Sequence, residues 1–316
     1  MTSIEWTDAT WNPLRGCTAV SEGCRNCYAA GQAARFSGPG LPYEGLAKFT
    51  PQGPRWTGEV RLVPEHLEDP LRWRKPRRVF VNSMSDLFHP AVSNEFISCV
   101  FAVMAAAPQH TFQVLTKRPE RMAAWFEWAA QHPHREGPGI GGPLAALGEA
   151  ICNFEGNLPA PFHEETDLSC LKVAWPLPNV WLGTSVEDQA AAEARIPHLL
   201  ASPAVVRFLS CEPMLGPVDL RSATAFGMAD PETTWAAAAR ARRRVDWVIV
   251  GGESGRGARP MDLAWARSLR DQAQGAGAAF FFKQVGACAS EASAKGGALA
   301  DIPEDLQVRQ FPEVRP

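Results

Sequence analysis

The chain repeats one local pattern six times, and this repetition constrains its fold more than any other feature. In each repeat a short apolar run, rich in β-branched and aromatic residues, ends in polar residues or glycine. The six runs lie at 77–86, 111–120, 179–188, 205–214, 245–255 and 278–286. Because these runs are continuously apolar rather than alternating, they are typical of strands that are buried on both faces.

Helices are predicted between these strands. The clearest candidates cover 94–107, 119–130, 188–200 and 262–275. Alternation of strand and helix predicts an α/β fold with a mainly parallel sheet. The segment that leads into the first cysteines supplies one more strand, so about seven units are expected, enough for a partial or complete TIM-like (β/α) barrel. A doubly wound open sheet is the alternative, because periodicity does not show whether the sheet closes.

The repeats are interpreted as a single barrel domain over 1–290, followed by a C-terminal tail at 291–316. A Gly- and Pro-rich stretch at about 132–178 is too long for an ordinary connection and is interpreted as an insertion over the barrel mouth. With 316 residues, of which 46% are hydrophobic, the chain is long enough to bury a large core.

The beginning of the chain has no basic segment followed by an apolar run, and no apolar stretch is long enough to span a membrane. We therefore expect a cytoplasmic protein with no membrane partner. The formal net charge of −3 argues against broad, sequence-blind binding of phosphate backbones, although it is compatible with a local basic patch.

Three cysteines lie close together in the sequence GCTAVSEGCRNCYA, namely Cys17, Cys24 and Cys27. In a reducing compartment such a group is interpreted as metal ligands or redox groups rather than as disulfides. A structural zinc ion takes four ligands, and neither a fourth cysteine nor a histidine lies in this segment. A [4Fe–4S] cluster held by three cysteines leaves one iron open to a small molecule. The trio favours such a cluster, with zinc plus a distant fourth ligand, or unliganded thiols, as alternatives.

Seven motifs between Ile4 and Gly286 carry a resemblance to a known family: IEWTDATWNPLRGCTAVSEGCRNCYA, SMSDLFH, VLTKRPERM, VWLGTSVEDQ, LSCEPMLGPV, VDWVIVGGESG and FFKQVG. They resemble the phage- and prophage-associated three-cysteine-motif family, which is itself similar to radical S-adenosylmethionine proteins. The resemblance implies S-adenosylmethionine as a second cofactor and generation of a deoxyadenosyl radical. Six residues separate Cys17 from Cys24, whereas the commonest radical S-adenosylmethionine motif has three.

Polar side chains follow every predicted strand, and they are the candidate cofactor-binding residues. Parallel strands bring their carboxyl ends to one edge of the sheet, so these groups are expected to surround one cavity that also contains the cysteines. The candidates are Ser83, Ser85, Asp86, Lys117, Thr184, Ser185, Glu187, Glu212 and Glu253.

Asp86 and Lys117 are the preferred cofactor contacts, because a carboxylate suits the amine of the zwitterionic cofactor and a cation suits its carboxylate. Alternatively, Asp86 caps the following helix and Lys117 is a solvated residue at a helix entrance. Cys211, at the end of another strand, is a candidate catalytic residue for hydrogen transfer. A cysteine in such a run is more often a small buried hydrophobe.

The leading hypothesis is therefore a radical S-adenosylmethionine-type enzyme that uses an unknown reductant, with nucleic acid or a nucleotide as the candidate substrate. Two alternatives belong to other classes. One is a zinc-stabilised nucleic-acid-binding protein, and the other is a non-catalytic iron–sulfur subunit that acts with a partner protein.

Overall fold

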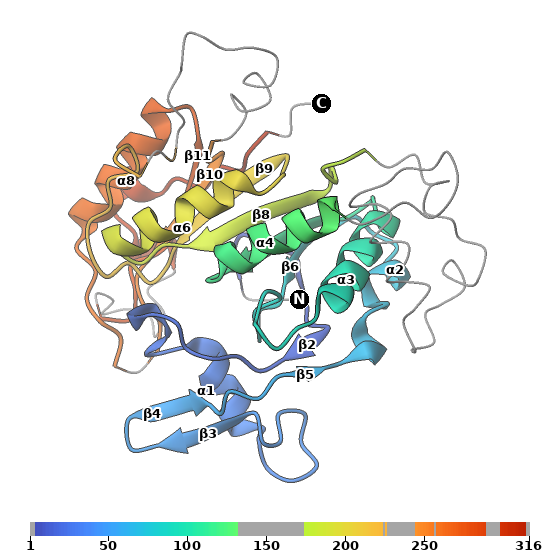
Figure 1. The fold of residues 1–316 in the computed structure, drawn as a ribbon. Coiled ribbons are helices and arrows are strands. Elements are labelled where there is room, and N and C mark those ends of the chain that lie inside the picture. Colours follow the sequence, from blue (N-terminus) through green and yellow to red (C-terminus); the bar gives the residue numbers. More distant parts are fainter. Residues whose placement is uncertain are drawn as a thin grey trace.

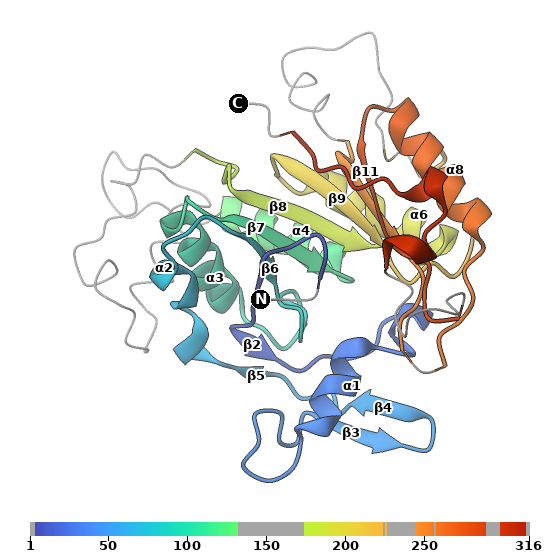
Figure 2. The same cartoon turned by 180° about the vertical axis from the view of Figure 1, so that it is seen from behind.

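A computed structural model describes residues 4–131, 174–223, 225, 244–255, 257–288 and 298–313. Its main feature is a seven-stranded sheet in the order β1-β6-β7-β8-β9-β10-β11, with every pairing parallel. The strands are β1 (Ala9–Trp11), β6 (Arg78–Val81), β7 (Thr111–Thr116), β8 (Val180–Ser185), β9 (Val206–Cys211), β10 (Trp247–Gly251) and β11 (Ala279–Gln284). The sheet curls into a half-barrel (Figures 1 and 2), which confirms the predicted partial barrel.

Four helices cover the convex face of the sheet (Figure 1). They are α3 (Asn94–Ala106), α4 (Pro119–Ala130), α6 (Gln189–Ala201) and α8 (Leu263–Gly275), each close to its predicted position. Side-chain caps explain where three of them begin. Asp188, for example, accepts a hydrogen bond from the backbone N–H of Ala191 at 2.8 Å, and this stabilises the first turn of α6.

The two faces of the sheet have different cores because successive side chains of a strand point to opposite sides. The convex face and its helices form the larger hydrophobic cluster. The concave face holds a smaller and strongly aromatic cluster: Trp6, Trp181, Val206, Phe208, Trp247, Ile249 and Phe281. These large side chains fill the half-barrel toward the amino ends of the strands, which leaves the space at the carboxyl ends to polar residues.

A smaller unit lies beyond the carboxyl ends of the strands (Figures 1 and 2). It consists of α1 (Tyr28–Arg35) and the antiparallel hairpin of β3 (Ala47–Thr50) and β4 (Gly53–Trp56). Two short strands, β2 (Leu14–Arg15) and β5 (Arg61–Leu62), pair beside it, and α2 (Asp69–Arg72) leads back to the sheet. The sequence patterns did not predict this hairpin.

The described part of the predicted tail, 298–313, belongs to the half-barrel. Phe282 donates its backbone N–H to the carbonyl of Val308 at 2.8 Å, and Phe311 packs on Trp247 with ring centroids 5.3 Å apart. This segment therefore covers the edge of β11. Most of the predicted insertion at about 132–178 lies outside the described residues, which resume at residue 174.

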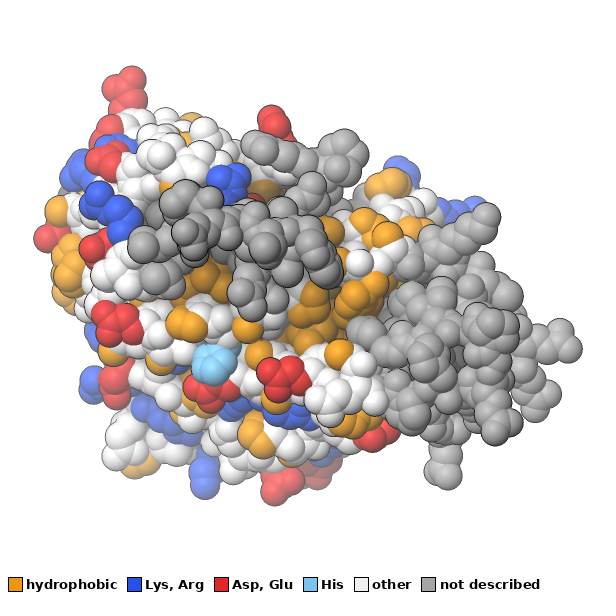
Figure 3. All heavy atoms as spheres, turned by 45° about the horizontal axis from the view of Figure 1, so that its top comes forward, with side chains coloured by type: hydrophobic (Ala, Val, Ile, Leu, Met, Phe, Trp, Pro, Cys, Tyr) orange, Lys and Arg blue, Asp and Glu red, His pale blue; other side chains and the backbone are white. Residues whose placement is uncertain are grey.

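The surface of the molecule is mixed in charge on the face shown in Figure 3, where acidic and basic side chains are interspersed around a central group of hydrophobic ones. Within the described ranges, no helix has both the length and the apolar character that a membrane crossing requires.

Candidate functional site

The three cysteines lie on a loop at the carboxyl edge of the sheet, between β2 and α1. We call residues 16–27 the cysteine loop. Cys17, Cys24 and Cys27 are all free and partly accessible to solvent, and Cys27 immediately precedes α1. Three groups of charged side chains attach this loop to the ends of the strands, and we call these groups the three anchors.

The first anchor is the buried ion pair between Arg118, after β7, and Asp86, after β6, with 2.8 Å between Nη1 and Oδ2. Arg118 Nη2 also donates to the carbonyl and the hydroxyl of Thr18, at 2.9 and 2.7 Å. Its Nη1 lies 3.7 Å from Cys17 Sγ. Burial and the nearby Asp86 carboxylate raise the pKa of the Cys17 thiol to about 12, so forming a thiolate there requires additional positive charge.

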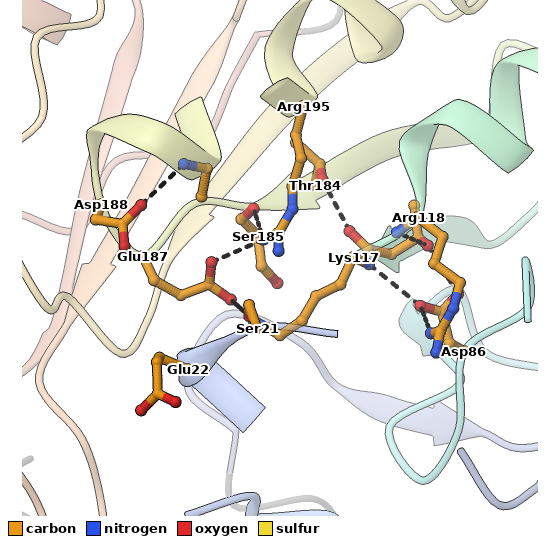
Figure 4. A network of polar contacts seen from close by, with 12 residues as sticks. Ser21, Glu22, Asp86, Lys117, Arg118, Thr184, Ser185, Glu187, Asp188 and Arg195 are labelled. Atoms are coloured by element: carbon orange, nitrogen blue, oxygen red, sulfur yellow. Dashed lines mark hydrogen bonds and ion pairs between the residues drawn. The ribbon is translucent and has the colours of Figure 1, made fainter. Parts of the chain in front are cut away.

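The second anchor is centred on Glu187, which follows β8 and is almost fully buried. Its carboxylate accepts hydrogen bonds from Lys117, from Arg195 of α6 at 2.7 Å and from the hydroxyl of Ser21 at 2.9 Å (Figure 4). Burial alone raises the pKa of Glu187, but Lys117 and Arg195 outweigh it and lower the value. The middle of the cysteine loop is thereby attached to a carboxylate that stays ionised.

The third anchor joins the end of the loop to β10. Glu253 accepts hydrogen bonds from Asn26 at 2.9 Å and from Arg259 Nε at 3.0 Å. Arg259 in turn donates to the backbone carbonyl of Glu22 at 3.0 Å. The loop is thus attached to β6, β7, β8 and β10 through contacts near all three cysteines.

A cavity of about 1160 Å³ lies on the concave face of the sheet, beside the cysteine loop. Cys27 lines it from the loop, and Trp6 and Phe80 line its apolar part. At the carboxyl ends of β9 and β11, Lys283 donates to both oxygens of Glu212, at 2.6 and 2.9 Å. The cavity therefore combines an aromatic wall with a polar wall near the cysteines.

The nine predicted cofactor-binding residues separate into two groups. The first group lines the cavity: Ser83, Lys117, Ser185, Glu212 and Glu253. The second group lies outside the cavity and has protein partners: Ser85, Asp86, Thr184 and Glu187. Asp86, for example, accepts hydrogen bonds from Thr116, Phe88, Lys117 and Arg118, so no oxygen of it is left for a ligand.

Asp86 consequently differs from both expectations that the sequence suggested. It does not lie against the cavity. Its carboxylate accepts hydrogen bonds from the backbone of Phe88, in the turn after β6, and from the first anchor. It does not cap α3, because Ser93 caps that helix. Cys211 is completely buried in the core of the convex face, and burial raises the pKa of its thiol to about 12. Its neighbour Ser210 points to the cavity instead.

Cys17, Cys24 and Cys27 are the residues of this loop that could hold a metal ion or a cluster. Within the part of the chain that the structure describes, no three His, Cys, Asp or Glu side chains are close enough together to hold one metal ion.

Sequence reasoning missed the role of Arg195 and Arg259 in the anchors. For Arg195 a signal was present in the sequence. The buried positions of α6 are Ala192, Arg195, Ile196 and Leu199, which form one helical face. An arginine on an otherwise apolar face predicts a buried carboxylate partner.

A family profile matches almost the whole length of the chain. The profile of a family described as "Protein of unknown function (DUF5131)" matches residues 1–309. No curated protein and no solved structure is significantly similar to the chain.

Proposed function

We propose that this chain, which belongs to the DUF5131 family, is a radical S-adenosylmethionine-type iron–sulfur enzyme. One observation carries the proposal: three free cysteines are attached by buried ion pairs to the carboxyl edge of a parallel half-barrel, beside a large cavity. This edge is where barrel enzymes place their reactive groups. Free thiols and an iron–sulfur cluster both suit the reducing cytoplasm, where we expect the protein to act.

In this proposal Cys17, Cys24 and Cys27 hold a [4Fe–4S] cluster, and one iron has no protein ligand. When bound, a cluster reduced by an external one-electron reductant supplies the electron that cleaves S-adenosylmethionine into methionine and a deoxyadenosyl radical, which then removes a hydrogen atom from a substrate. The anchors set the position of the loop. Arg118 places positive charge 3.7 Å from Cys17 Sγ, which favours the thiolate form of this ligand.

The polar wall of the cavity is the proposed site of S-adenosylmethionine. Ser83 and Ser185 offer hydroxyl groups, and Lys117, which also pairs with Glu187, offers a cation for the cofactor carboxylate. Glu253 offers its Oε1, which accepts a hydrogen bond from Arg259 alone among the described residues, as an acceptor for the cofactor amine. Glu212, on the far side, is held by Lys283 and completes this wall. Ligand cavities for one drug-sized molecule measure roughly 300–1000 Å³. The volume of about 1160 Å³ therefore leaves room for part of a substrate as well.

The first experiment tests the cluster. Anaerobically purified protein should be brown and contain about four irons and four sulfides per chain. Cys17→Ala, Cys24→Ala and Cys27→Ala should each lose the iron absorbance. Cys288→Ala is the matched control, because Cys288 is exposed and lies outside the cysteine loop. A colourless protein that holds one zinc ion would contradict the proposal and favour the zinc-stabilised alternative.

The second experiment tests the reaction. The loaded protein is reduced with dithionite and incubated with S-adenosylmethionine, and 5′-deoxyadenosine is measured by chromatography. We expect slow formation of this product even without substrate. A loaded, reducible cluster that neither binds nor cleaves S-adenosylmethionine would contradict the enzyme and favour a non-catalytic iron–sulfur subunit.

A further inference from the structure

A strongly basic segment lies at the end of the cavity that is farther from the cysteine loop. Residues 72–78 read RWRKPRR and join α2 to β6. We call this segment the basic rim. It contains five cations, and the acidic residues near it are Glu5, Asp8, Glu68 and Asp69, the last of which binds His66. The rim therefore carries positive charge in excess, in a protein whose net charge is negative.

The ion pairs of the rim leave three of its cations available. Arg72 pairs with Glu68 at 2.7 Å, and Arg78 pairs with Asp8 at 3.0 Å. No ion pair joins Arg74, Lys75 or Arg77 to any carboxylate among the described residues. Arg74 and Lys75 are exposed to solvent, and Arg77 is partly exposed.

The basic rim opens into the same cavity that Cys27 lines. Trp73, Lys75 and Arg77 all contribute to the cavity wall. Between Arg77 and Ser83, which lies near the cysteine loop, the chain follows β6, whose four residues span about 13 Å. A ligand that contacts both ends must therefore be longer than one nucleoside.

Aromatic rings accompany the cations along this path. The guanidinium of Arg77 lies over the ring of Trp73, 5.1 Å from its centroid. Phe80 follows inside the cavity and is partly exposed, and the buried ring of Trp6 packs behind it with ring centroids 4.7 Å apart. Cations beside aromatic faces are the combination that binds single-stranded nucleic acid, because phosphates contact the cations and unpaired bases stack on the rings.

We propose that the basic rim binds the phosphates of a single-stranded nucleic acid and directs one of its nucleotides into the cavity. The inference rests on the proposed function, for which it names the substrate class. Paired bases face the inside of a duplex and do not reach these rings, so single strands are expected to bind better than duplexes.

The test measures the binding of fluorescent oligonucleotides, about 12 nucleotides long, to the cluster-loaded protein. Fluorescence anisotropy gives the dissociation constant at a series of salt concentrations. The rim variant carries Arg74→Gln, Lys75→Gln and Arg77→Gln. The control variant carries Arg35→Gln, Lys48→Gln and Arg221→Gln, which removes the same charge outside the cavity wall. Single-stranded DNA, single-stranded RNA, duplex DNA and a mononucleotide are compared.

We expect the rim variant to bind single strands at least tenfold more weakly at low salt, with a salt slope reduced by about two, since each phosphate contact contributes roughly 0.7. The control variant should bind like the wild type. The DNA and RNA arms identify which single strand is preferred.

Equal binding by the rim and control variants would overturn the proposal. So would tighter binding of duplex than of single strands, or binding of the mononucleotide alone. Iron content and 5′-deoxyadenosine formation are measured on the same wild-type preparation. If both are normal while no oligonucleotide binds, the substrate class is wrong and the proposed enzyme stands.

Discussion

Two carboxylates in this protein each bind two cations, but their surroundings are opposite. Glu187 binds Lys117 and Arg195 under the cysteine loop, and its side chain is 2% exposed. Asp305 binds Arg267 and Arg270 at the surface near α8, and its side chain is 43% exposed. The contacts are equally short, at 2.7 Å for Arg195–Glu187 and 2.9 Å for Arg267–Asp305.

The difference shows that contact distance alone does not reveal what an ion pair does. At the surface, water and salt screen the attraction, and the loss of one partner is compensated by solvent. In the interior, removal of one partner leaves a buried charge without compensation. Only the buried group therefore fixes the position of the cysteine loop, while the exposed group merely joins two surface segments.

The largest expected effect is that of Glu187→Gln. This change leaves Lys117 and Arg195 without their counter-charge, so the free energy of unfolding should fall by about 3–5 kcal/mol. Chemical denaturation measures it, with Asp305→Asn as the matched control and a far smaller loss expected there. Similar losses in the two variants would show that burial does not distinguish the two groups.

A somewhat smaller effect is expected for Asp86→Asn. One buried cation, Arg118, then lacks a charged partner, whereas the amide still provides an acceptor for the backbone. The free energy of unfolding should fall by about 2–3 kcal/mol. Iron content should also fall, because Arg118 holds Thr18 beside Cys17. A variant with full iron content would show that the first anchor is dispensable for the loop.

The ion pair of Glu212 and Lys283 in the cavity wall is intermediate in exposure between the Glu187 and Asp305 groups, since about 17% of the Glu212 side chain is exposed. Glu212→Gln should lower the free energy of unfolding by about 1 kcal/mol, measured by the same denaturation. A loss of free energy as large as that of Glu187→Gln would show that solvent screens this ion pair less than its exposed fraction indicates.

The smallest effect concerns the pH dependence at Asp305. Hydrogen bonds from Arg267 and Arg270 lower the pKa of its carboxyl from 3.8 to about 2. Because the folded-state pKa is depressed, the stabilisation is complete above about pH 4 and is lost as the pH falls from about 4 to 2.

The difference in melting temperature between wild type and Asp305→Asn should therefore be constant from pH 7 to about pH 4 and then shrink. Circular dichroism measures it at each pH. Added salt should reduce the difference as well, because the group is exposed. A difference that disappears already near pH 6 would indicate that another group is responsible.

The strands and helices of this fold were predictable because local sequence determines them. The continuous apolar run of β8 and the start of a helix at residue 188 are both visible in the sequence, and both are confirmed. The grouping of strand-end residues at one edge was also predictable, since it follows from a parallel sheet. Neither inference requires knowledge of distant contacts.

The division of those strand-end residues into cavity and anchors was not predictable. Ser185 lines the cavity, whereas Glu187, two residues later, binds Ser21 at a separation of 166 residues. Alternation along a strand stops where the strand ends, and the direction of each later side chain depends on how the sheet curls. The basic rim was missed for a related reason, because only the fold brings residues 72–78 to the cavity.

Gly23 in the cysteine loop has a consequence for how sequences of this family diverge. A Cβ atom at position 23 would lie 2.4 Å from the side chain of Glu187, which Lys117, Arg195 and Ser21 prevent from moving away. Positions 23 and 187 are therefore expected to covary. In a relative with a side chain at position 23, we expect a shorter or uncharged residue at position 187. Such a relative would then lack this attachment of the cysteine loop.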